Sequence, residues 1–199
     1  MIPSLSDGRR LVLASTSPYR RQLLERLALP FECARPGVDE TPLPGEAPRE
    51  LVARLALAKA SVVAQRMPHA LVIGSDQIAV LDDAVIGKPG THAAAREQLQ
   101  RASGRSVEFL TSLCLFDADS GNTQLEVVSL RVHFRALLPQ QIERYLQREQ
   151  PYDCAGSFKS EGLGIALFER LEGDDPNALI GLPLIALTTM LEAEGVSVL

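Results

Sequence analysis

Short apolar runs alternate along the chain with segments of helical periodicity. Residues 10–14 form an apolar run typical of a buried strand. The polar residues Ser15 to Pro18 follow, where Ser17 suits the N-cap of a helix and Pro18 suits its first turn. We therefore predict a strand over 10–14 and a helix over 18–27.

The same alternation continues to the end of the chain. Pattern and turn residues predict further strands over 31–34, 70–73, 78–81, 84–86 and 165–171, and a long hairpin from 107–116 and 125–134. Helices are predicted over 49–66, 92–102, 139–150 and 183–194, and a proline-rich loop over 36–48. Strands alternating with helices predict an α/β fold with a largely parallel central sheet and an antiparallel insertion. Nothing marks a domain boundary, so we expect residues 1–199 to form one domain with two lobes.

Composition narrows the class of protein. A length of 199 residues with 46% hydrophobic residues suits a single globular domain. The net charge of −5 argues against a general nucleic-acid binder, which needs a broad basic surface. No apolar run is long enough to span a bilayer, and the first ten residues lack the apolar core of a secretory signal. We expect a cytoplasmic protein without a membrane partner.

The three cysteines, Cys33, Cys114 and Cys154, stand far apart with no CxxC pair. This pattern predicts reduced, buried structural thiols instead of disulfides or a zinc site. With three histidines and no G-x-S-x-G elbow, a Ser–His–acid or Cys–His hydrolase is also poorly supported.

Lysine is scarce, because only Lys59, Lys88 and Lys159 accompany the arginines among 20 basic residues. Lys88 and Lys159 lie in glycine-containing turns, where positioned charges often serve ligands. Lys59 lies on the apolar face of its predicted helix. Such a lysine either extends its ammonium to water or reaches into a cleft that holds an anion.

Two segments combine polar groups with the expected end of a strand. One predicted helix N-terminus is surrounded by Ser15, Arg20 and Arg21. These residues could bind an anion such as a phosphate chain. The alternative is a capped helix with two solvated arginines. Asp76 follows the apolar run 70–73, at the usual ligand position of an α/β sheet. There it could hold a divalent metal or deprotonate water, and the alternative is a turn-forming Asp.

Glu40 and Glu161 add carboxylates in predicted loops. Acids that can hold Mg²⁺, together with bases that can hold phosphates, are what phosphoanhydride cleavage requires. Neither a P-loop nor a GxGxxG motif is present, which disfavours P-loop NTPases and dinucleotide enzymes.

At these residues the sequence resembles the Maf nucleotide pyrophosphatases, and the match runs nearly from end to end. The motifs that carry it are LASTSPYRRQLL (13–24), VDET (38–41), LAKA (57–60), GSDQ (74–77), GKP (87–89), GSFKSEGLG (156–164) and DPNALIGLPL (175–184). The resemblance implies hydrolysis of nucleoside triphosphates between the α and β phosphates, with Mg²⁺, Mn²⁺ or Co²⁺. It also implies an elongated two-lobed mixed sheet with flanking helices, similar to inosine-triphosphatase-like enzymes, and an active cleft between the lobes.

The family's functional positions are carried over residue by residue. The resemblance implies that Asp76 is the proton acceptor and binds the metal with Glu40. Lys59 and Lys88 would join them in catalysis. Substrate would be bound by Ser15, Arg20 and Lys159. The partner is then a small nucleotide, and a homodimer is compatible with the family.

Three positions indicate the branch. Tyr19, Gln77 and Glu161 differ from the residues typical of the branch that acts on dTTP and UTP, and they resemble the YceF-type branch, whose preferred substrate is 7-methyl-GTP. Methylation at N7 makes guanine cationic, which suits an aromatic face at Tyr19 and a carboxylate at Glu161. Gln77 offers a donor and an acceptor for purine selection.

Two alternatives stay open at the level of sequence. The family is also linked to arrest of septum formation, so the chain could be a nucleotide-binding regulator of cell division. The same kind of enzyme could instead act on UTP, dTTP or another modified triphosphate.

Overall fold

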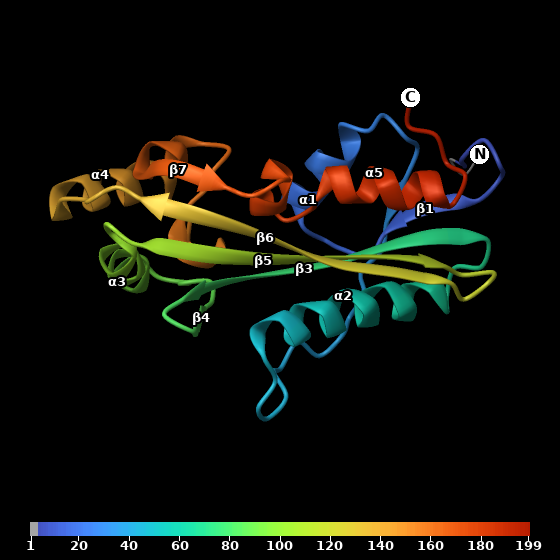
Figure 1. Ribbon diagram of the computed structural model, residues 1–199, viewed down its shortest axis with the longest axis horizontal. Coiled ribbons are helices and arrows are strands. Elements are labelled where there is room, and N and C mark those ends of the chain that lie inside the picture. Colours follow the sequence, from blue (N-terminus) through green and yellow to red (C-terminus); the bar gives the residue numbers. More distant parts are fainter. Residues whose placement is uncertain (1–3) are drawn as a thin grey trace.

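One mixed sheet runs through the computed structural model, which describes residues 4–199 (Figure 1). Seven strands form this sheet, in the order β2-β1-β3-β5-β6-β7, with β4 paired to the end of β3. Their bounds are β1 Arg10–Leu13, β2 Glu32–Cys33, β3 Ala70–Leu81, β4 Ala84–Ile86, β5 Ser106–Asp117, β6 Thr123–Phe134 and β7 Phe168–Glu172. A mixed α/β fold of this kind is the one that the family resemblance implied.

The sheet is less parallel than the sequence pattern predicted. Only β1–β2 and β1–β3 pair in parallel, whereas β3–β4, β3–β5, β5–β6 and β6–β7 are antiparallel. The prediction of a largely parallel sheet was wrong because the runs 70–73 and 78–81 belong to one continuous strand. The polar residues between them look like a turn in the sequence, but they continue the ladder opposite β5.

Helices cover both faces of the sheet, and the predicted ones form close to their expected bounds. They are α1 Pro18–Glu25, α2 Pro48–Ala64, α3 His92–Ala102, α4 Pro139–Glu149 and α5 Leu184–Ala193. Ser17 caps α1 as predicted, since its hydroxyl accepts the Arg20 N–H. The strand predicted over 165–171 is shorter, because 3₁₀ turns occupy Ala155–Ser157 and Leu163–Leu167 before β7, and another lies at Pro176–Ile180.

The hydrophobic core follows the alternation of side chains along the strands. Leu11, Leu13 and Leu71 face α1 and α5, whereas Val12 and Val72 face α2 on the other side. Figure 1 shows α2 on one face of this half of the sheet and α1 and α5 on the other. At the opposite end, α3 and α4 surround a separate cluster of buried phenylalanines.

The cysteines only partly match their prediction. All three are free thiols, but only Cys114 is buried. Cys33 is exposed because β2 is a two-residue strand at the edge of the sheet, and Cys154 is half-buried.

No helix within residues 4–199 is both long and apolar enough to cross a membrane. The prediction that no secretory signal is present concerns residues 1–10, of which residues 1–3 lie outside the described residues.

Candidate active site

A cavity of about 660 Å³ gathers nine of the ten residues that the sequence proposed for the site. These are Ser15, Tyr19, Arg20, Glu40, Lys59, Asp76, Gln77, Lys88 and Glu161. Lys159 does not line the cavity. Its backbone N–H donates to the hydroxyl of the buried Tyr145, 3.0 Å away. The predicted substrate contact of Lys159 therefore has no direct counterpart in this geometry.

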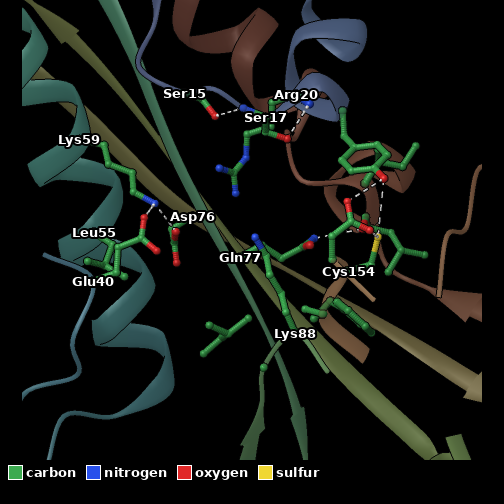
Figure 2. Close-up of a pocket in the computed structure, with 18 of the residues that line it drawn as sticks. Ser15, Ser17, Arg20, Glu40, Leu55, Lys59, Asp76, Gln77, Lys88 and Cys154 are labelled. Carbon is green, nitrogen blue, oxygen red and sulfur yellow. Dashed lines mark hydrogen bonds and ion pairs between the residues drawn. The ribbon is translucent and has the colours of Figure 1, made fainter. Parts of the chain in front are cut away.

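Lys59 joins the two carboxylates of the site. Its Nζ lies 2.6 Å from Asp76 Oδ1 and 2.6 Å from Glu40 Oε1. The side chain is 6% exposed, so it does not extend to bulk water. Of the two interpretations of this lysine, the structure supports a cation that reaches from the apolar face of α2 into a cleft (Figure 2).

Asp76 lies in the middle of β3, not beyond a strand end as the sequence suggested. Asp76 does lie just past the end of the parallel part of the sheet. The parallel pairing of β1 with β3 ends at Leu13 and Ile73, so the next residues of β3 are not covered by β1. The turn that leads from β1 into α1, with Ser15, reaches the same cavity.

The even residues of the GSDQ segment face α2. A Cβ on Gly74 would come within 2.1 Å of the Ala56 carbonyl oxygen, so only glycine lets α2 lie this close to β3. The fully buried Ser112 hydroxyl accepts the Asp76 N–H at 3.1 Å and donates to the Val52 carbonyl of α2 at 2.7 Å. These contacts fix the helix that carries Lys59 against the strand that carries Asp76.

The odd residues of the segment hold the chain near Gly181. The buried Ser75 hydroxyl donates to the Gly181 carbonyl at 2.9 Å, and the Arg20 Nε donates to the same oxygen at 2.8 Å. The Gln77 amide nitrogen donates to the carbonyls of Ala178 and Leu179. Gln77 thus presents only its oxygen to a ligand, which corrects the prediction that it offers both a donor and an acceptor.

Arg20 lines the cavity, in contrast to its neighbour Arg21, which pairs with Glu25 on the surface. Burial lowers the pKa of the Arg20 guanidinium, and the charges of Asp76 and Glu40 oppose that shift. An arginine stays charged under such conditions. In Figure 2, Arg20 and the exposed Lys88 point into the pocket from opposite sides.

These features agree with a comparison of the whole sequence. The sequence model described as "Maf-like protein" matches residues 10–194. The chain belongs to the Maf family.

Curated members of the Maf family include close relatives of this chain. A protein of Nitrosococcus oceani is 61% identical over 95% of this chain and 95% of its own length. Proteins of Polaromonas sp. and Burkholderia thailandensis are each 59% identical, over 96% and 94% of this chain and 87% and 88% of their own lengths. All three carry the name "7-methyl-GTP pyrophosphatase".

The end of the Maf pocket away from Lys59 includes residues that sequence reasoning missed. The Tyr19 hydroxyl donates to Asp153 Oδ2 at 3.3 Å, and Cys154 lies beside both (Figure 2). Burial raises the pKa of the Cys154 thiol to about 11, so it is protonated at neutral pH and unsuited to nucleophilic attack. The signal that could have found Asp153 is its place just before the GSFKSEGLG motif.

The two carboxylates of the Maf site fit a metal ion only if further ligands, such as water or substrate phosphates, complete its coordination. Within residues 4–199, no group of three or more His, Cys, Asp or Glu side chains is arranged to hold a metal ion. Asp76 and Glu40 converge as two carboxylates. This donor set matches Mg²⁺, which is commonly held by one or two carboxylates together with water and substrate phosphates.

Proposed function

We propose that this chain hydrolyses 7-methyl-GTP to 7-methyl-GMP and diphosphate, and so removes a modified nucleotide. The observation that carries the proposal is that two chemically different sets of side chains line one cavity. Arg20, Lys59 and Lys88 supply positive charge around Asp76, whereas Tyr19 and Glu161 provide an aromatic face and a carboxylate. The names of the relatives at about 60% identity support the same substrate.

The residues around Asp76 account for the chemistry. Lys59 bonds Asp76 Oδ1, which orients the carboxylate and leaves Oδ2 to accept the proton of the attacking water. The bond between the α and β phosphates breaks, and diphosphate leaves. Arg20 and Lys88 neutralise charge on the triphosphate, since phosphoryl transfer is stabilised mainly by position and charge.

We propose that Asp76 and Glu40 hold a divalent cation, Mg²⁺, Mn²⁺ or Co²⁺, together with phosphate oxygens. When bound, the cation supplies Lewis-acid stabilisation of the phosphates. Removing divalent cations with EDTA is expected to lower pyrophosphate release by at least about 100-fold, because two carboxylates alone repel the triphosphate. Excess Mg²⁺ should restore the rate. An EDTA-treated enzyme with an unchanged rate would contradict the metal requirement.

The substrate is tested by kcat/KM for 7-methyl-GTP, GTP, UTP and dTTP, measured as pyrophosphate release. A cationic base on the face of Tyr19 should favour 7-methyl-GTP over GTP by about 2- to 30-fold, which corresponds to a cation–π energy of about 0.5–2 kcal/mol. The pyrimidine nucleotides should be poorer still. If UTP or dTTP proves the best substrate, the chain acts like the other branch and the proposed substrate is wrong.

We place this activity in the cytoplasm, where reducing conditions suit three free thiols. Gln77 would contribute its oxygen to base selection, because its nitrogen is engaged by backbone carbonyls. A role for Lys159 in binding substrate stays a prediction, and it would require this side chain to act from beside the cavity.

A further inference from the structure

Asp153 lies beside Tyr19 and Cys154, and Figure 2 shows Cys154 across the pocket from Lys59. It lines the cavity together with Tyr19 and Glu161, and it is exposed. Neither Asp153 nor Glu161 forms an ion pair within residues 4–199. Lys159, the one cation of the loop over 153–162, does not line the cavity. Lys159 is close enough for its charge to lower the pKa of the neighbouring Cys154 thiol, but it pairs with neither carboxylate. Asp153 and Glu161 therefore line the pocket without an ion pair among the described residues.

Asp153 also contacts Tyr19, the aromatic residue of the site, through the tyrosine hydroxyl. The Tyr19 O–H donates to Asp153 Oδ2 at 3.3 Å. Burial raises the pKa of the Tyr19 phenol, and the neighbouring Cys154 and Asp153 raise it further. The phenol therefore stays protonated at neutral pH and acts as the donor in this pair. Asp153 thus helps to fix the orientation of the ring.

We infer that Asp153 is a specificity-determining residue for a positively charged purine base and that it acts together with Glu161. The inference rests on the proposed function. Methylation at N7 gives the guanine ring a full positive charge, whereas guanine in GTP is neutral. A carboxylate near the base attracts the first ring by Coulomb's law and gives the second no such advantage. Asp153 adds this attraction at the place where Tyr19 would contact the base.

The test replaces Asp153 with Asn and compares 7-methyl-GTP with GTP. Asp153→Asn removes the charge but keeps an oxygen that can accept the Tyr19 hydroxyl. The ratio of kcat/KM for 7-methyl-GTP to that for GTP is expected to fall about 3- to 10-fold, as for a partly screened ion pair. Raising the salt concentration should lower the ratio of the unchanged protein toward that of the variant, because salt screens exposed charges.

Three further variants make the result specific. Asp153→Glu keeps the charge and should retain most of the preference. Glu161→Gln should lower the same ratio, since it removes the second carboxylate. Asp83→Asn is the matched control: Asp83 is exposed in the turn between β3 and β4, does not line the cavity, and has a φ of 62° that Asn also tolerates. Its ratio should stay unchanged.

The outcomes separate the two proposals. If the unchanged protein prefers 7-methyl-GTP and Asp153→Asn keeps the same ratio of kcat/KM values, the charge of Asp153 does not contribute to the preference for a cationic base. If Asp153→Asn lowers kcat/KM equally for 7-methyl-GTP and GTP, Asp153 only shapes the pocket, and the inference is again wrong. If the unchanged protein releases no pyrophosphate from either nucleotide, the proposed function itself fails.

Discussion

Replacing Asp76 with Asn should lower pyrophosphate release by about 10²- to 10⁴-fold, the range expected when a general base is lost. The amide has nearly the same shape as the carboxylate, but it cannot take a proton from water. The buried Lys59 ammonium would keep Glu40 as its partner, so the fold should persist. The measurement is kcat for pyrophosphate release, with the thermal midpoint recorded to show that the variant is folded.

Asp119→Asn provides the matched control for this change. Asp119 is exposed and bonds His69, and it does not line the cavity. The same loss of one carboxylate there should leave kcat within about twofold, as is usual for a surface substitution away from the site. A folded Asp76→Asn protein with undiminished turnover would show that another group accepts the proton.

Gly74→Ala should be the most destabilising small substitution at the site. The new Cβ would lie 2.1 Å from the Ala56 carbonyl oxygen and 2.9 Å from the Ala60 nitrogen, both in the backbone of α2. Because a helix backbone cannot yield as a flexible side chain does, α2 must move away from β3. We expect a loss of about 3 kcal/mol in the free energy of unfolding and a large loss of activity, as Lys59 leaves Asp76.

Gly87→Ala is the comparison for stability. A Cβ on Gly87 would meet no atom within 4 Å, and its φ is not in the left-handed region. The free energy of unfolding should therefore change by less than about 1 kcal/mol. Denaturant unfolding of both variants measures the difference. Equal stability of the two would mean that α2 adapts to the added methyl group without cost.

The local elements were largely predictable from the sequence, because their signals are local. Ser17 and Pro18 begin α1, and Thr91 caps α3, where its hydroxyl accepts the Ala94 N–H. The direction of the strands was not predictable in the same way. It depends on β3 continuing through a polar segment. There the Gln77 side chain donates to Thr111 and the Asp76 backbone N–H donates to Ser112, and both partners are distant in sequence.

The candidate site was predictable as a set of residues, through the family motifs, more than as a geometry. The motifs named Lys59, Asp76 and Glu40, which the structure brings into direct contact. They did not indicate that the amide of Gln77 bonds the carbonyls of Ala178 and Leu179, because backbone acceptors leave no trace in the sequence pattern. Asp153 was missed for a related reason: its link to Tyr19 spans 134 positions.

The position of the Gly181 carbonyl in the sequence determines when the pocket can form during synthesis. It receives hydrogen bonds from Arg20, near the start of the chain, and from Ser75. During synthesis on the ribosome, Arg20 and Ser75 emerge long before their common acceptor. The pocket can therefore be completed only after Gly181 has been made, and a product that terminates before this residue would hold Arg20 without its anchor.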